Sequence, residues 1–180
     1  MEDQMSKMTL HGFEISDIDD IMVWETGDLV LQFTGREAPT SREIEFAILR
    51  DHIIPHPWYM AICLNSRVIG SISVMQGSGE ARCRGELGYV LASHYWGQGL
   101  ATCAVKMVIS NIFEEIPELE RLEALVDVQN VRSQRVLERV GFVKDGLLRK
   151  YLVFRGQSKD MLMYSFLSSD VLNLWSTFDL

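Results

Sequence analysis

Runs of β-branched and aromatic residues predict a series of strands in this chain. Residues 58–64 and 68–75 form two such runs, and the turn-forming pair Asn65-Ser66 separates them, so we expect an antiparallel hairpin. A glycine-rich stretch over 76–79 predicts a loop after this hairpin. Further strands are expected over 85–91, 121–128, 147–154 and 161–167.

A second pattern, apolar residues three and four positions apart, predicts a long helix over 100–113. One face of this helix would be buried, and it carries Ala101, Ala104, Val105, Val108 and Ile112. Pro117 marks the end of the segment, because proline cannot continue a helix. A shorter helix is expected between Asn130, which can cap its start, and Gly141, which is typical of a helix end.

The first part of the chain, up to Pro55, predicts helices joined by loops. Ser16 can cap one helix, and a capping box over residues 40–43 can start another. The order of elements is then helices, a strand meander, and strand–helix–strand–helix–strand–strand. This order favours an α+β fold: a mixed, mostly antiparallel sheet flanked by helices, with one parallel crossover around the long helix.

The length of 180 residues suits a single domain that buries roughly 70% of its unfolded surface. We therefore expect one domain over residues 1–180, with its core at about 10–168 and a C-terminal tail at 169–180. The tail is apolar over 171–178. The pattern leaves open whether this tail packs on the domain itself or on a partner chain in a homodimer.

Composition and charge exclude several classes of protein. Hydrophobic residues make up 47% and charged residues 23%, and no apolar run reaches the ~20 residues that span a bilayer. The net charge is −8 and Lys and Arg form no cluster of five or more, so we expect neither nucleic acid nor a membrane as a partner. The three cysteines lack zinc-ligand spacing, and no targeting signal is visible. We therefore expect reduced thiols, no metal and a cytoplasmic location.

The segment 89–102 carries the strongest chemical signal. A strand ends there, a loop bends, and Gly97 and Gly99 open the long helix. Glycines let the backbone approach a ligand, and the first turn of a helix presents N–H groups and a positive dipole end, so the segment is suited to a phosphate or pyrophosphate. A P-loop is excluded because no Gly-Lys-Ser/Thr follows, and the third glycine of a dinucleotide fingerprint would fall at Thr102.

Two runs in the right order and separation carry a family resemblance. Residues 86–102, with Tyr95-Trp96-Gly97-Gln98-Gly99-Leu100-Ala101-Thr102, are followed by 126–142, with Gln129-Asn130-Val131-Arg132-Ser133. Together they resemble the GCN5-related N-acetyltransferase (GNAT) family, and in particular its ribosomal-protein alanine acetyltransferases (RimJ/RimL-like). The resemblance extends from about Ser16 to Leu167. It implies the GNAT fold, acetyl-CoA as cosubstrate and a primary amine as acceptor.

The resemblance also implies which residues bind acetyl-CoA. The family's phosphate loop has Gln or Arg at the position of Trp96, glycine at that of Gly99, and glycine or alanine at that of Ala101, so Trp96 departs from the pattern. The phosphates would be bound by Trp96, Gly97, Gln98, Gly99, Leu100, Ala101 and Thr102. The pantetheine arm would pair with the backbone of Val90, Leu91 and Ala92, in a gap between two splayed strands. Asn130 would hold the pantetheine, and Ser133 would lie near the thiol sulfur.

Two residues are candidates for catalysis. Glu86 matches the strand position of the general base in some members of the family; an acceptor ammonium, with a pKa near ~10, must lose a proton before its nitrogen can attack. The other interpretation makes Glu86 a partner in a structural salt bridge or a solvated residue. Ser133 would steady or protonate the departing thiolate, or would only support a helix start. The N–H of Leu91 would stabilise the tetrahedral oxyanion.

Two functions from different classes follow. The first is an acetyl-CoA-dependent N-acetyltransferase in which the amine attacks the thioester directly within a ternary complex. The second is a non-catalytic module that senses acyl-CoA, since a fold alone does not establish chemistry. The presence of both Glu86 and Ser133 favours the enzyme. The acceptor stays open among a protein or peptide N-terminus, a lysine, a polyamine and a small amine.

Overall fold

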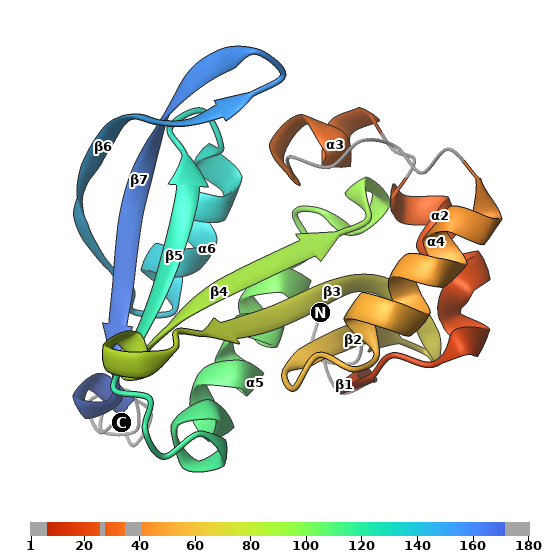
Figure 1. Ribbon diagram of the computed structural model, residues 1–180, viewed down its shortest axis with the longest axis horizontal. Helices are drawn as coiled ribbons and strands as arrows, with labels where there is room; N and C mark the ends of the chain where they lie inside the picture. The colour runs from red at the N-terminus through yellow and green to blue at the C-terminus, as the bar shows by residue number, and fades with distance from the viewer. Residues whose placement is uncertain (1–6, 26–27, 35–40, 172–180) are drawn as a thin grey trace. The chain divides into compact units, whose positions relative to one another are not determined.

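The computed structural model describes residues 7–25, 28–34 and 41–171. Its strands are hydrogen bonded in the order β1-β2-β3-β4-β5-β7-β6 (Figure 1). Their bounds are β1 Met8–Gly12, β2 Tyr59–Leu64, β3 Arg67–Gln76, β4 Arg84–Leu91, β5 Arg121–Asp127, β6 Val143–Phe154 and β7 Gln157–Leu167. Strands β4 and β5 are parallel, whereas β1–β2, β2–β3, β5–β7 and β6–β7 are antiparallel. The mixed, mostly antiparallel sheet expected from the sequence is confirmed.

The helices fall before and between these strands. The α-helices are α2 Ile18–Glu25, α3 Asp28–Thr34, α4 Arg42–Ile48, α5 Leu100–Glu115 and α6 Val131–Arg139. Short turns of other helix types are η1 Ile15–Asp17, η2 Leu49–Ile53, η3 Gly79–Ala81, η4 Ser93–Tyr95 and η5 Ser168–Asp170. In the described residues, no helix is long and apolar enough to cross a bilayer.

The described residues divide into two compact units. The first, which we call the N-terminal unit, comprises Met1–Ser73 and Tyr89–Ala104; the second, the C-terminal unit, comprises Val74–Gly88 and Val105–Leu180. The chain therefore passes from one unit to the other within β3, β4 and α5. Whether the two units act as the single domain expected from the sequence stays a prediction.

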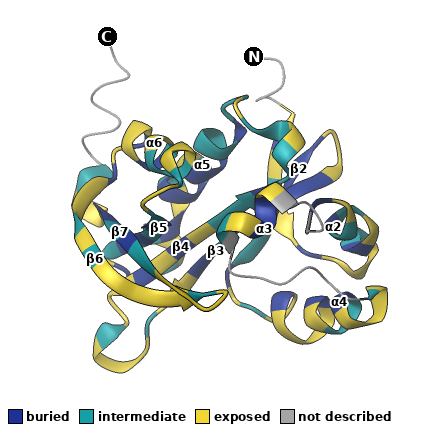
Figure 2. Cartoon of the chain, turned by 90° about the horizontal axis from the view of Figure 1, so that it is seen from above, coloured by how far each residue is buried: buried dark blue, intermediate teal, exposed yellow. Residues whose placement is uncertain are grey.

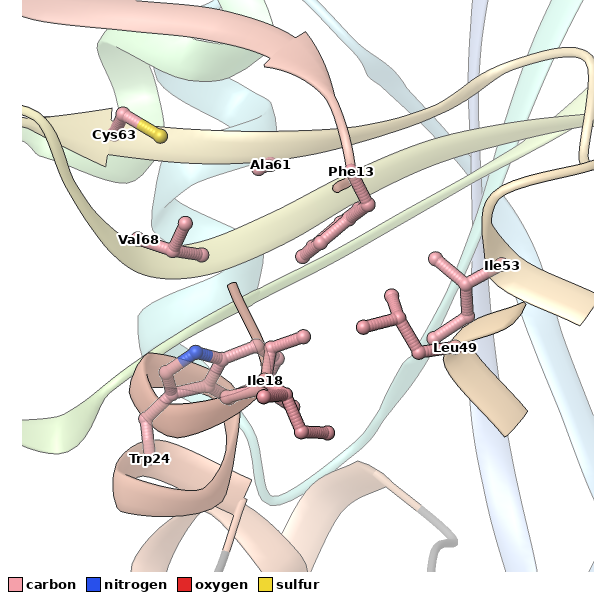
Figure 3. Close-up of a cluster of buried hydrophobic side chains, with 9 residues drawn as sticks. Phe13, Ile18, Trp24, Leu49, Ile53, Ala61, Cys63 and Val68 are labelled. Carbon is pink, nitrogen blue, oxygen red and sulfur yellow. The ribbon is translucent and has the colours of Figure 1, made fainter. Parts of the chain in front are cut away.

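The N-terminal unit is built on a cluster of buried apolar side chains (Figure 3). Helix α2 contributes Ile18, Ile21 and Trp24, and these pack with residues of the strands and of η2. Trp24 is only 5% exposed. The rest of the cluster consists of Phe13, Leu49, Ile53, Ala61, Cys63 and Val68.

In the C-terminal unit, strand alternation separates two faces of the sheet. On β5, Leu122, Ala124 and Val126 are buried, whereas the residues between them are partly exposed. The buried face continues on β7 with Tyr164 and Phe166. The edge strand β6 is exposed along most of its length (Figure 2). Burial of alternate residues is the pattern of a sheet that is covered on one face.

Several sequence expectations are confirmed. Asn65 and Ser66 have φ of 52° and 63°, the left-handed values that a tight hairpin turn requires. On α5 the buried face includes Ala104, Val105, Val108 and Ile112, each fully buried, with Ala101 half-buried. Asn130 caps α6, because its Oδ1 accepts the N–H of Ser133 at 3.1 Å.

Other expectations were wrong in detail. Ser16 does not cap a helix: Glu14 precedes η1, and its N–H donates to Asp17 Oδ2 at 2.8 Å, which starts the turn earlier. Strand β1 was not expected: Met8, Thr9, Leu10 and His11 alternate between apolar and polar residues, but the strand is only five residues long and only Met8 is buried. Strands β6 and β7 begin four residues earlier than predicted. Within the expected capping box, Ser41 caps α4, and Thr40 lies outside the described residues. Residues 172–178 of the apolar C-terminal tail also lie outside the described residues.

Candidate functional site

The loop between β4 and α5 has a left-handed backbone at two glycines. Gly97 and Gly99 have φ of 78° and 81°, values that side-chain-bearing residues rarely adopt. A Cβ placed on either glycine would meet no atom within 4 Å, so space lies beside the backbone at both positions. The two glycines therefore serve the conformation of the loop and leave its surface uncovered.

The start of α5 follows directly on this loop. Its first helical hydrogen bond joins the N–H of Cys103 to the carbonyl of Gly99 at 3.0 Å. The N–H groups of Leu100, Ala101 and Thr102 thus belong to the first turn, where the helix supplies no acceptor. Gly99 occupies the capping position and has no side chain that could accept a hydrogen bond from these N–H groups. This is the arrangement that binds anions at a helix N-terminus.

Side-chain and backbone bonds fix the end of β4. Ala92 donates its N–H to the carbonyl of Ile69 on β3 at 2.8 Å. Since successive residues of a strand direct their N–H groups to opposite edges, the N–H of Leu91 points to the edge away from β3. The indole N–H of Trp96 donates to the carbonyl of Leu91 at 2.8 Å, so this side chain shapes the strand end.

Gly70 is a positioning residue that the sequence analysis missed. A Cβ on Gly70 would lie 2.1 Å from the carbonyl oxygen of Val90 and 3.0 Å from the Cα of Leu91. Only glycine allows β3 to approach the end of β4 this closely. An isolated glycine within an apolar strand pattern was the available signal.

A cavity of about 250 Å³ lies within the N-terminal unit. On its wall, the carboxylate of Asp20 accepts bonds from the guanidinium of Arg67 at 2.8 Å and from the N–H of Val68 at 3.0 Å. The indole nitrogen of Trp24 has no hydrogen-bond partner within the described residues. The cavity is lined by Asp20, Val23, Trp24, Arg67, Val68, Ile69, Ala92, Ser93, His94 and Tyr95.

In the C-terminal unit, Glu86 lies exposed on β4, opposite Glu123 in the pairing of β4 with β5. No salt bridge to Glu86 is present within the described residues. The neighbouring Glu123 differs, because the guanidinium groups of Arg84 and Arg121 each approach it to 2.8 Å. Burial favours the neutral form of Glu123, but hydrogen bonds from these two arginines outweigh it and lower the pKa of its carboxyl. Of these two carboxylates, Glu123 is in an ion pair, and Glu86 is in none within the described residues.

The other candidates of the C-terminal unit lie at the start of α6. Asn130 follows β5 by three residues and uses its side-chain oxygen for the helix cap, and Ser133 is half-buried in the first turn. Two tyrosines provide phenols in this unit. Tyr151 is exposed on β6, whereas Tyr164 is buried and donates to Glu138 Oε1 at 3.0 Å. Burial and the Glu138 carboxylate raise the pKa of Tyr164 to about 12, which makes it a poor proton donor.

Comparison with known proteins decides the family. The family model described as "Acetyltransferase (GNAT) domain" matches residues 7–143. The chain belongs to the GNAT acetyltransferase family. The resemblance expected from its two sequence runs is thereby confirmed.

Curated relatives and solved structures of this family agree with the match. "Probable N-acetyltransferase YjcK" of Bacillus subtilis is 36% identical over 106 residues, which cover 59% of this chain and 58% of YjcK. The chain thus spans little more than half the length of that relative. A spermidine N-acetyltransferase from Vibrio cholerae, solved with CoA and spermine, superposes with a TM-score of 0.79 at 20% identity, covering 93% of this chain and 99% of that one.

A third comparison concerns the branch of the family. The ribosomal-protein-S5-alanine acetyltransferase from Vibrio fischeri superposes with a TM-score of 0.75 at 23% identity, covering 91% of this chain and 94% of that one. At this identity the two solved structures establish that the fold is shared.

Proposed function

We propose that this protein is an acetyl-CoA-dependent N-acetyltransferase that moves the acetyl group to a primary amine within a ternary complex. The observation that carries the proposal is the loop of Gly97 and Gly99, whose left-handed backbone leads into the open first turn of α5. Membership of the GNAT family supports it.

In this proposal the pyrophosphate of acetyl-CoA binds to the backbone of Gly97–Thr102. Donors in that segment are N–H groups, and the positive end of the α5 dipole adds to the attraction. Trp96 contributes by closing the end of β4 through its bond to Leu91, where family members have Gln or Arg. The pantetheine pairs with the backbone of Val90–Ala92, while Asn130 holds it from the start of α6.

The proposed chemistry needs a base, an oxyanion donor and an acid. Glu86, which no cation neutralises within the described residues, takes the proton of the acceptor ammonium, directly or through water. The amine nitrogen then attacks the thioester carbon, and the N–H of Leu91 stabilises the oxyanion that forms. When the C–S bond breaks, the hydroxyl of Ser133 steadies or protonates the departing thiolate.

The acceptor is a primary amine of unassigned type. Asp20 and Arg67 compensate each other's charge on the cavity of the N-terminal unit, so that cavity offers no net charge to attract a polycation. Among the possible acceptors, we propose a peptide or protein N-terminus first and a small amine second. A cytoplasmic location is proposed with it, since Cys63, Cys83 and Cys103 are present as thiols.

The test is release of free CoA thiol from acetyl-CoA over a panel of amines. The panel contains an alanine-initiated peptide, the same peptide with an acetylated N-terminus, spermidine and N-acetyl-lysine amide. We expect release with the first peptide and none with its acetylated form. Binding of CoA without thiol release for any amine would support the acyl-CoA sensor and overturn the enzyme.

A further inference from the structure

The pairing of β4 with β5 is short and ends at one residue pair. Arg84, Gly85 and Glu86 pair with Arg121, Leu122 and Glu123, and no pair of these strands follows within the described residues. At the start of the pairing, the N–H groups of Glu120 and Arg121 both donate to the carbonyl of Cys83, at 2.7 and 3.0 Å.

Beyond Glu123, β5 stays paired with β7 along one edge, while its other edge has no strand partner in the described part of the chain. Residues Ala124–Asp127 continue to pair with β7, where Asp127 lies opposite Met161. On the β4 side these four residues have no strand partner in the described part of the chain. An unpaired strand edge presents backbone N–H and C=O groups that an extended, amide-bearing ligand can bond.

A side-chain network crosses the sheet where the pairing ends. The carboxylate of Glu123 accepts from Arg84 of β4 and from Arg121 of its own strand, each at 2.8 Å. Arg121 also donates to Asp145 of β6 at 2.5 Å, and Asp145 accepts from the hydroxyl of Ser165 of β7 at 2.9 Å. Five side chains thus connect four strands, and Glu123 is the member that connects β4 to β5.

The position of Glu123 makes these bonds stronger than ordinary surface pairs. Its side chain is 13% exposed, and both of its carboxylate oxygens are engaged, one by each guanidinium. Partly buried charges are screened less by salt than exposed ones. The pair Arg82–Glu118 in the same unit is similar in chemistry, with 2.9 Å between its atoms, but its side chains are 58% and 62% exposed.

We infer that Glu123 is a positioning residue, which with Arg84 and Arg121 fixes where β4 and β5 separate and so shapes the edge that receives the pantetheine of acetyl-CoA. The inference rests on the proposed function for the identity of the ligand. Glu123 itself would touch neither the ligand nor the reacting atoms. Its effect is to hold two features in register: Glu86, which is its own partner in the pairing of β4 with β5, and the edge of Ala124–Asp127 that has no strand partner.

The experiment compares Glu123→Gln with Glu118→Gln, its matched control in an exposed pair. Titration calorimetry with CoA, steady-state kinetics and a thermal scan are recorded for each variant. We expect Glu123→Gln to raise the Kd for CoA and the KM for acetyl-CoA roughly tenfold or more, the size of losing one charge-assisted hydrogen bond. Glu118→Gln should change both by less than about twofold, since surface pairs contribute little.

Amide hydrogen exchange gives a readout that a loss of stability alone would not move. In the wild type, CoA should protect the amides of Ala124–Asp127, and in Glu123→Gln this protection should be weaker at saturating CoA. Arg84→Met, at a more exposed position, replaces Glu123→Gln if that variant does not fold. The double variant should bind CoA no more weakly than the worse single variant, because both remove the same bond.

The outcomes separate the two proposals. Wild-type affinity for CoA in Glu123→Gln or Arg84→Met, with only a lowered Tm, overturns the positioning role and leaves the acetyltransferase proposal standing. If the wild type binds CoA but transfers no acetyl group, the proposed function fails while the effect of Glu123 on CoA binding still supports its positioning role. If the wild type does not bind CoA, both proposals are wrong.

Discussion

The two helix starts that the sequence assigns to the cofactor differ in what occupies their N–H groups. At α5 the capping position is Gly99, which has no side chain, has a positive φ and would carry a Cβ that meets no atom within 4 Å. At α6 the side chain of Asn130 accepts the N–H of Ser133. A helix whose first-turn N–H groups have no side-chain acceptor can bind an anion with them. A helix capped by its own side chain is stabilised by the cap, but the capped N–H is no longer available to a ligand.

We therefore propose that α5 binds the phosphates and that α6 has a supporting role. Proton transfer is proposed for neither helix, because Glu86 lies on a strand. The predictions below test these assignments, and each would change the comparison if it failed.

The largest effect is expected for Glu86→Gln, which keeps size and hydrogen bonding but loses the proton acceptor. Loss of a general base typically lowers the rate about 10²–10⁴-fold, and the affinity for CoA should not change because no helix N-terminus is altered. The measurement is kcat/KM for the acceptor in Glu86→Gln and in the wild type, with acetyl-CoA saturating. Equal values in both proteins would make Glu86 a solvated residue.

Next in size is Gly99→Val, which tests the open helix start. CoA at a hundredfold excess over its Kd should stabilise the wild type by roughly 2.7 kcal/mol, and the variant should lose this shift. A side chain there would force a strained φ and would fill the space in which we place the pyrophosphate. Gly156→Val is the matched control, because Gly156 also has a positive φ of 73° with nothing within 4 Å. A full CoA response in Gly99→Val would remove the phosphate site from this loop.

The same reasoning shows how far the sequence reaches. The α5 helix and the hairpin at Asn65-Ser66 were predictable, because periodicity and turn chemistry are local. The glycine turn before α5 was predictable for the same reason, whereas its use as an anion site stays a prediction. The bond of Glu123 to Arg84 was not, since it depends on β4 lying beside β5, a pairing of residues 37 positions apart. The prediction that Ser16 caps a helix was wrong because the carboxylate of Asp17 accepts the N–H of Glu14, so the helical turn begins before Ser16.

A third prediction concerns Gly70, where close approach of β3 supports the end of β4. Gly70→Ala would place a methyl group 2.1 Å from the carbonyl oxygen of Val90, and the strands would have to move apart. We expect a loss of about 1–3 kcal/mol in the free energy of unfolding, as for overpacked cores. Gly12→Ala is the control, because a Cβ there meets nothing within 4 Å. Urea denaturation measures both, and equal stabilities would show that β4 does not depend on this approach.

The smallest effect, at the capped helix, separates two roles of Asn130. Asn130→Ala removes the cap and should cost about 1 kcal/mol in urea denaturation. Asn130→Asp keeps an oxygen that can accept the N–H of Ser133 but loses the amide nitrogen, the donor left over for a pantetheine carbonyl. If Asn130 holds the cofactor, Asn130→Asp should retain wild-type stability while its Kd for CoA rises several-fold, measured by calorimetry. If the affinity for CoA follows stability in both variants, Asn130 acts on the helix alone. The open start of α5 would then be the one helix terminus, among those described, that contacts acetyl-CoA.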